Sequence, residues 1–240
     1  MDLLQKVHDR LELLSSLMWQ AHDTRPAMEI VYRDLFVRDI TRLGLNDFYY
    51  PVGSAANHSL LYFITRCFLE FPIRSVIEFG AGQSTILMSQ LNEALKKEAA
   101  ITTVEHDTLW AEIVRAKVNH KVITADLVPK TIENHSIHHY GGEYFDSSAR
   151  YDFFLIDGPP AYEQDATFNR LGALELIENN LADNFVIVVD DMHRQGEQEL
   201  SRLIQQKLRK TGRNFNEVSI RGTRPQHAFA SGSFFSAAYF

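Results

Sequence analysis

The sequence predicts an α/β fold in which a doubly wound, mostly parallel sheet is covered by helices. Short apolar runs that suit buried strands alternate with longer runs whose apolar residues recur at helical spacing. One predicted strand, at 75–79, runs into a glycine-containing turn and then into a helix. Several strands end in an acidic residue, which brings carboxylates to one edge of a parallel sheet.

The fold is organised around residues 75–84, Ser-Val-Ile-Glu-Phe-Gly-Ala-Gly-Gln-Ser. Gly80 and Gly82 let the backbone turn sharply and approach a ligand, because neither carries a Cβ. Ser84 and Thr85 are candidate N-caps of the helix that follows. We therefore expect the free N–H groups at this helix start to face a nucleotide-like ligand.

Glu105 ends the next strand, about 25 residues after the turn, where a carboxylate can accept both hydroxyls of a ribose. A dinucleotide such as NAD requires a third small residue, and that position is Thr85. With Glu78 two positions before the first glycine, the turn instead resembles the E/D-x-G-x-G motif of class I S-adenosylmethionine-dependent methyltransferases. The resemblance implies a Rossmann-like sheet of seven strands. It also implies a set of residues that bind S-adenosylmethionine: Glu78, Gly80, Gly82, Ser84 and Glu105.

Composition limits the classes of partner. The 240 residues suffice for one α/β domain and a modest addition. A net charge of -7 argues against nucleic acid as the main partner, because binding its backbone requires Lys and Arg. The single cysteine, Cys67, fits a reducing compartment. The sequence shows neither a signal-peptide pattern nor a membrane-length apolar run, so we expect a cytoplasmic protein with no membrane partner.

Two helices are predicted before the sheet. Apolar residues between positions 4 and 18 form one helical stripe, and a second helix begins near Pro26 and ends at Gly44. We expect an N-terminal helical extension over residues 1–50, followed by the Rossmann-like domain over residues 51–240. The stripe suits either docking onto the body of the protein or a homodimer formed through the N-terminal helices.

Three further segments continue the predicted order. The aromatic stretch 46–53 is either a loop that closes over a substrate or a packed connector. A helix is expected from Ser54 to Pro72 and would cover the sheet. Another helix starts near Asp107, and its predicted inward side chains are Trp110, Ile113 and Val114.

Asp126 follows a predicted strand at 121–125. A carboxylate there resembles the methyltransferase position beside the adenine amino group, and the alternative is a helix N-cap. Residues 130–150 are polar and rich in turn formers, with histidines at 135, 138 and 139. Clustered histidines suggest a metal site, but the irregular spacing and the lack of a nearby cysteine favour an exposed loop.

Two more predicted strands end in carboxylates. The strand at 151–156 leads to Asp157, and the strand at 184–189 leads to Asp190 and Asp191. Burying three carboxylates together is costly without a cation or a proton between them. The arrangement resembles the metal site of cation-dependent, catechol-type O-methyltransferases. That resemblance implies Mg²⁺ or another divalent cation, which would lower the pKa of an acceptor hydroxyl.

The resemblance is incomplete at two positions, because Asp191 replaces the family's Asn and Pro160 replaces its basic Lys. His193 is therefore a candidate catalytic base. Asp157 is expected to serve the acceptor, the metal and the cofactor, since its strand end points into the ligand crevice. The alternative is that Asp190 and Asp191 cap the next helix and that His193 is only exposed.

The C-terminal segments 215–221 and 227–240 alternate like two antiparallel strands joined by a turn. Such a terminal hairpin resembles the last two strands of the methyltransferase sheet. The Asp-Gly-Pro-Pro turn at 157–160 is similar to a strand-end motif of glucuronic-acid O-methyltransferases, which implies a carbohydrate acceptor. A nucleic-acid amino-methyltransferase would carry Pro-Pro directly after the acid, whereas Gly158 intervenes here.

The predicted function is therefore S-adenosylmethionine-dependent O-methylation of a small-molecule or sugar-like hydroxyl, assisted by a divalent cation. The alternatives are an NAD-dependent oxidoreductase and a non-catalytic Rossmann-like binding protein.

Overall fold

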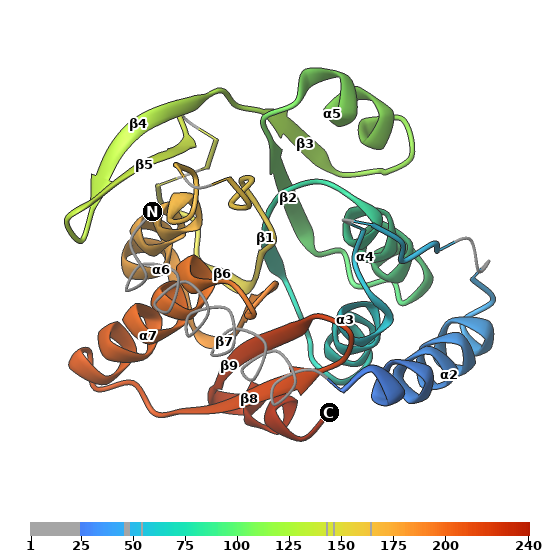
Figure 1. The fold of residues 1–240 in the computed structure, drawn as a ribbon. Coiled ribbons are helices and arrows are strands. Elements are labelled where there is room, and N and C mark those ends of the chain that lie inside the picture. The colour runs from blue at the N-terminus through green and yellow to red at the C-terminus, as the bar shows by residue number, and fades with distance from the viewer. Residues whose placement is uncertain (1–24, 46–48, 54, 143, 146, 164) are drawn as a thin grey trace, which may run out of the picture.

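A seven-stranded sheet forms the centre of the protein in a computed structural model, which describes residues 25–45, 49–53, 55–142, 144–145, 147–163 and 165–240 (Figure 1). Across the sheet the strands are β3 (Lys121–Thr124), β2 (Ala100–Glu105), β1 (Ser75–Phe79), β6 (Tyr151–Ile156), β7 (Leu181–Val189), β9 (Pro225–Ser231) and β8 (Phe215–Arg221). The first five pair in parallel, and β9 and β8 pair antiparallel. The predicted doubly wound, mostly parallel, seven-stranded Rossmann-like sheet with a C-terminal hairpin is confirmed.

Helices cover both faces of this sheet. The described helices are α2 (Pro26–Arg42), α3 (His58–Glu70), α4 (Gln83–Ala94), α5 (Thr108–Arg115), α6 (Leu174–Asn180) and α7 (Gln195–Lys210), with 3₁₀ segments η1 (Asn169–Ala173) and η2 (Gly232–Tyr239). Side chains of β6 alternate between two cores: Phe153 and Leu155 pack with α3 and α4, while Phe154 and Ile156 pack with α6 and α7. Because the strand order reverses between β1 and β6, a crevice is expected outside the carboxyl ends of these two strands.

The second predicted N-terminal helix is confirmed as α2. Pro26 occupies its first turn, and Phe36 and Ile40 are fully buried in the core that contains α3. The predicted helix at 4–18 lies outside the described residues. The domain boundary near residue 50 and the homodimer stay predictions.

Residues 127–140 form a hairpin, so the predicted exposed loop over this part of the chain is wrong. Strand β4 (Leu127–Ile132) pairs antiparallel with β5 (His135–Tyr140), through a turn in which Glu133 and Asn134 both have positive φ. The side chain of His139 is fully buried, and its Nδ1 lies 3.0 Å from the backbone oxygen of Asn169. Burial lowers the pKa of His139 to about 3. Histidines stand on both faces of β5, with His138 exposed and His139 buried, so hydropathy did not show the alternation of a strand.

Several element details differ from prediction. Helix α3 is capped by Asn57, whose side chain accepts from the N–H of Leu60, so the helix starts at His58 and not at Ser54. On α5, Trp110 and Ile113 are exposed by 44% and 49%, and only Val114 of the predicted inward set is buried. The chain after β9 forms η2 and not a continued strand.

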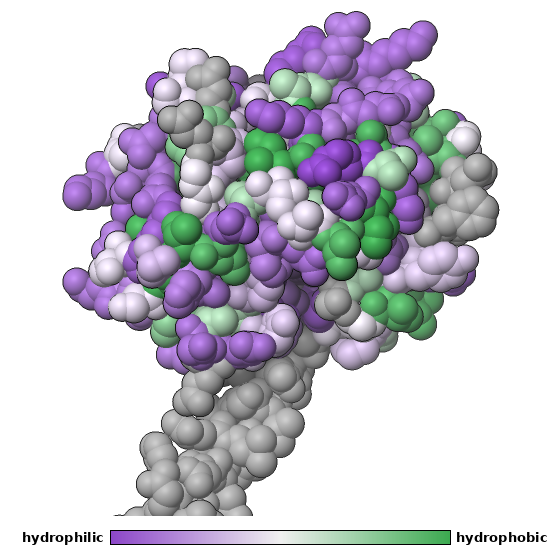
Figure 2. All heavy atoms as spheres, turned by 90° about the horizontal axis from the view of Figure 1, so that it is seen from above, coloured by the Kyte–Doolittle hydropathy of each residue, from purple (hydrophilic) through white to green (hydrophobic). Residues whose placement is uncertain are grey.

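The surface seen in Figure 2 carries small hydrophobic groups scattered among mostly hydrophilic side chains. Exposed apolar side chains of this kind are common on folded proteins and require no special explanation. Within the described ranges, no helix combines the length and apolar character needed to cross a bilayer.

Candidate functional site

A pocket lies where the strand order reverses, and both predicted motifs line it. Its lining includes Gly80, Ala81 and Glu105 from the first motif. Asp157 and Asp191 of the acidic set line the same pocket. The glycine turn and part of the acidic set are therefore brought together at the carboxyl ends of β1, β6 and β7, as the chain order predicts for parallel strands.

The two glycines of the turn have different roles. Gly80 has φ +89°, and a Cβ there would lie 2.8 Å from the backbone oxygen of Asp157. Gly80 therefore permits close packing of the turn against the end of β6. A Cβ at Gly82 would meet nothing within 4 Å. Gly82 instead leaves open space at the start of α4, where a ligand can approach backbone N–H groups.

Glu78 lies beneath the turn and not on the pocket wall. Its carboxylate is fully buried and accepts hydrogen bonds from the hydroxyls of Ser84 (2.6 Å), Thr85 (2.7 Å) and Thr103 (2.7 Å). Gly82 occupies the N-cap position of α4, so the predicted N-caps Ser84 and Thr85 are wrong. Glu78 and Ser84 are thus placed to shape the turn, because their polar atoms are turned toward one another.

Burial raises the pKa of Glu78 to about 7, although the three hydroxyls oppose this shift. The folded protein therefore binds a proton at Glu78 between pH 4.5 and 7 that the unfolded chain has released. We expect the free energy of unfolding to fall as pH rises through this window, by an amount on the order of 3 kcal/mol for this group. Urea denaturation of the Glu78→Gln variant should show a flatter pH dependence than the wild type. The exposed Glu112→Gln should leave the dependence unchanged, and equal slopes in wild type and Glu78→Gln would contradict the assignment.

Glu105 lines the pocket and holds the turn in place. Its Oε2 accepts from the N–H of Ala81 (2.9 Å), and its Oε1 accepts from the backbone N–H groups of His106 (2.7 Å) and Asp107 (2.9 Å). The indole of Trp110 donates to the backbone oxygen of Ala81 (2.7 Å). Two side chains therefore fix the turn at Ala81: the predicted ribose-binding carboxylate of Glu105 accepts from its N–H, and Trp110 donates to its oxygen.

Asp126 is exposed and lies outside the pocket lining. Strand β4 follows it directly, so the alternative interpretation as a helix N-cap is wrong. Its backbone oxygen accepts from the N–H of Gly141 (2.8 Å), which closes the base of the β4–β5 hairpin. Its predicted contact with an adenine group stays a prediction.

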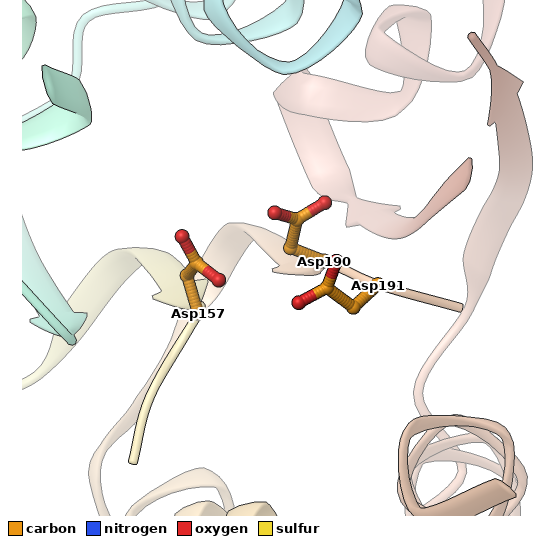
Figure 3. Close-up of side chains that lie close together, drawn as sticks. All are labelled: Asp157, Asp190 and Asp191. Atoms are coloured by element: carbon orange, nitrogen blue, oxygen red, sulfur yellow. The ribbon is translucent and has the colours of Figure 1, made fainter. Parts of the chain in front are cut away.

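Three carboxylates meet at the ends of β6 and β7 (Figure 3). Asp157, Asp190 and Asp191 each offer a carboxylate oxygen, and these oxygens lie within 4.8 Å of one another. It is the one such group of acidic, histidine or cysteine ligands among the residues the structure describes. Burial raises the pKa of Asp157 and of Asp190, and the neighbouring carboxylates raise both further.

A buried arginine, Arg170, stands among these acids, and the sequence analysis did not identify it. Its Nη2 lies 3.2 Å from Asp157 Oδ1 and 3.3 Å from Asp191 Oδ2, and its Nη1 lies 3.3 Å from Glu197 Oε1. Burial alone would lower the pKa of Arg170, but Asp157, Glu197 and Asp191 outweigh it and raise that pKa. The available signal was a charged residue inside the apolar run at 168–177.

Oxygen atoms in the cluster remain available after these bonds are counted. Asp190 Oδ2 and Asp191 Oδ1 are buried and have no hydrogen-bond partner in the described structure, although Arg224 lies 3.8 Å from the latter. Together with Glu197, the three aspartates face the arginines Arg170, Arg194 and Arg224. With all groups ionised the acids exceed the arginines by one charge, which one proton would balance. The two oxygens without a partner are of the type that hard cations prefer, so the donor atoms also fit such an ion.

His193 is half-buried and lies outside the pocket lining, and burial lowers its pKa. Its role as a base stays a prediction. Tyr140, which the sequence analysis missed, does line the pocket, and its buried hydroxyl has no hydrogen-bond partner among the described residues. Pro160 lines the pocket where the resembled family carries Lys.

No protein-family model matches the sequence, and no curated protein matches it. Solved structures with a similar fold include an O-methyltransferase from Bacillus cereus in complex with S-adenosylhomocysteine, at 15% identity and TM-score 0.47, covering 90% of this chain and 100% of that chain. A methyltransferase from Pyrococcus furiosus shares 19% identity at TM-score 0.46, covering 86% and 98%. The O-methyltransferase TomG from Streptomyces achromogenes shares 16% identity at TM-score 0.43, covering 84% and 90%. Likeness at these levels carries no argument about the function of this chain.

Proposed function

We propose that the protein is an S-adenosylmethionine-dependent O-methyltransferase acting on a small hydroxylated acceptor. The observation that carries the proposal is that the glycine turn and the carboxylates Asp157 and Asp191 line one pocket. A donor held at the turn and an acceptor held at the acids would share one confined space, which favours group transfer between them.

The donor would lie against the turn at residues 80–82, whose own N–H groups are engaged by Val104, Glu105 and Thr85, and its ribose would lie at Glu105. The bound cofactor supplies an electrophilic methyl group. Thr85 supports this donor over NAD. Its side chain is fully buried, and its hydroxyl both accepts from the N–H of Gly82 (2.8 Å) and donates to Glu78. A dinucleotide turn instead uses a small residue at this position for close packing of helix and strand.

Asp157, Asp190 and Asp191 would hold a divalent cation such as Mg²⁺ or Mn²⁺, since carboxylate oxygens are the ligands these ions prefer. When bound, the cation supplies Lewis-acid activation of the acceptor hydroxyl. The protein contributes carboxylates whose remaining oxygens are held by Arg170 and by Gln226, so that their orientation is fixed before any ligand arrives.

Calorimetry with S-adenosylhomocysteine and with NAD distinguishes the two classes of cofactor. We expect S-adenosylhomocysteine to bind the wild-type protein and NAD not to bind. Tight binding of NAD alone would overturn the proposal. Turnover is then measured as consumption of S-adenosylmethionine over catechols and hydroxylated sugar acids. If the protein binds S-adenosylhomocysteine in calorimetry but consumes no S-adenosylmethionine with any acceptor of the panel, a non-catalytic binding protein is favoured.

Metal binding has its own test. A cation present at 100 times its dissociation constant stabilises the folded state by about 2.7 kcal/mol. We expect Mn²⁺ to raise the Tm of the wild type and Asp157→Ala to lose this rise. Asp183→Ala, whose carboxylate is fully exposed, should keep it. A rise that survives in Asp157→Ala would contradict the metal part of the proposal.

The proposal includes a cytoplasmic location, which rests on the single cysteine and the ordinary soluble composition. A carbohydrate acceptor rests only on the Asp-Gly-Pro-Pro resemblance. The exclusion of nucleic acid rests on the net charge.

A further inference from the structure

A buried hydrogen-bond network links the acid cluster to the N-terminal helix. Gln226, on β9, has no exposed surface, and its Nε2 donates to Asp190 Oδ1 (2.8 Å). The same nitrogen contacts Asn57 Oδ1 (3.0 Å) and the backbone oxygen of Arg224 (2.8 Å). Gln226 Oε1 accepts from Ser59 Oγ (3.0 Å). Both polar atoms of this side chain are therefore engaged in the interior.

These partners allow the amide only one orientation. The nitrogen of Gln226 faces three oxygens, and none of them can donate a hydrogen bond while Asp190 is ionised. Rotating the amide by half a turn would set its oxygen against all three. The side chain thus presents a fixed N–H donor to Asp190 Oδ1 and leaves Asp190 Oδ2 without a hydrogen-bond partner among the described residues.

The network continues to α2. Asn57 Nδ2 contacts Glu29 Oε2 at 3.3 Å. Glu29 also accepts from the backbone N–H of Ser59 (3.2 Å) and from that of Thr223 (2.9 Å). One carboxylate on α2 therefore joins the start of α3 to the turn between β8 and β9, the turn that leads into Gln226.

Gly222 makes this approach possible. A Cβ at Gly222 would lie 2.1 Å from Glu29 Oε2 and 2.4 Å from Ser59 Oγ. The backbone N–H of Arg25 also donates to the oxygen of Gly222 (3.0 Å). Because Gly222 has no side chain, the β8–β9 turn can pack directly against Glu29 of α2.

We propose that Gln226 is a positioning residue for Asp190, and that Asn57 and Glu29 extend this support to α2. The inference rests on the proposed function, in which Asp190 takes part in the acidic site. Gln226 fixes one oxygen of the Asp190 carboxylate so that the other is available to a ligand. The N-terminal helix is then a supporting part of the site.

The test uses the Gln226→Met variant, which keeps the length of the side chain and removes its donor. We expect its crystal structure to show the Asp190 carboxylate in a changed conformation. Calorimetry with Mn²⁺ alone should show an affinity lower by about 10- to 100-fold, the range typical of lost supporting hydrogen bonds at metal sites. Binding of S-adenosylhomocysteine should be unchanged. Ser231→Ala is the matched control, because it removes a part-buried hydrogen bond from the other end of β9.

The outcomes separate the two hypotheses. An Asp190 carboxylate that keeps its conformation in Gln226→Met, with unchanged Mn²⁺ affinity, overturns the positioning role. If the wild type binds neither Mn²⁺ nor S-adenosylhomocysteine, the proposed function fails. The Asp190 conformation in the variant crystal then still decides whether Gln226 positions it.

Glu29 tests the outer part of the network. We expect Glu29→Ala to weaken Mn²⁺ binding less than Gln226→Met does, because its effect passes through Asn57. Glu29→Gln keeps one acceptor oxygen and should recover part of the loss. Asp34→Ala, an exposed position on the same helix, should bind Mn²⁺ as the wild type does. If Asp34→Ala weakens Mn²⁺ binding as much as Glu29→Ala does, the loss is a general effect of changing α2. The proposed support of Asp190 by Glu29 through Asn57 and Gln226 would then be contradicted.

Discussion

The Gly80→Ala variant is expected to lower the free energy of unfolding by about 3 kcal/mol or more. A positive φ costs a residue with a side chain about 1–3 kcal/mol, and forcing an atom into a packed interior typically costs a further 1–3 kcal/mol. Both costs apply, because Gly80 has φ +89° and the added Cβ would lie 2.8 Å from the Asp157 oxygen and 3.1 Å from the Gly158 nitrogen. These neighbours are backbone atoms at the end of β6, which cannot move without distorting the strand. Urea denaturation measures the loss.

Gly82→Ala separates folding from binding in the same turn. Its Cβ would meet nothing within 4 Å, so the expected loss in the free energy of unfolding is only that of Ala in place of Gly at the N-cap of α4, about 1 kcal/mol. The methyl group would instead occupy the space in which the donor approaches the turn. Calorimetry should therefore show at least tenfold weaker binding of S-adenosylhomocysteine. Undiminished affinity in Gly82→Ala would mean that the donor is not held at this turn.

The sequence was sufficient to predict the central sheet and the edge of that sheet at which the candidate site lies. Buried strands that alternate with helices leave few topologies, because parallel crossovers are right-handed and short. The acidic residue that ends β2 and those directly after β6 and β7 must then lie on the same edge. The convergence of Glu105, Asp157 and Asp191 on one pocket follows from chain order alone.

The residues that hold these acids could not be predicted in this way. Arg170 is 13 positions from Asp157, and Gln226 is 36 positions from Asp190, so each contact depends on packing between separate elements. The pattern of 135–140 was hidden for another reason. Histidines occupy outer and inner positions of β5 alike, so hydropathy could not separate its two faces.

The Arg170→Met variant is expected to lose about 3–5 kcal/mol of stability near neutral pH. Removing one member of a buried ion network leaves the others uncompensated, and a loss of this size is typical of that change. Asp157, Asp191 and Glu197 would all lose their shared partner. Methionine fills most of the space, so the loss reports on charge more than on packing. Urea denaturation measures it, with Arg202→Met as the control, because Arg202 pairs with Glu199 at the surface, where such pairs contribute little.

The loss in Arg170→Met should depend on pH with a defined sign. Burial already raises the pKa of Asp157 and of Asp190 above 3.8 and that of Glu197 to about 7, and removing the nearby cation raises these values further. The folded variant therefore binds protons that its unfolded chain releases, so its free energy of unfolding falls more steeply than that of the wild type as pH rises from about 5 to 8. A deficit relative to wild type that is the same at pH 5 and pH 8 would mean that removing Arg170 leaves the protonation of these acids unchanged, and that Arg170 stabilises the fold through packing.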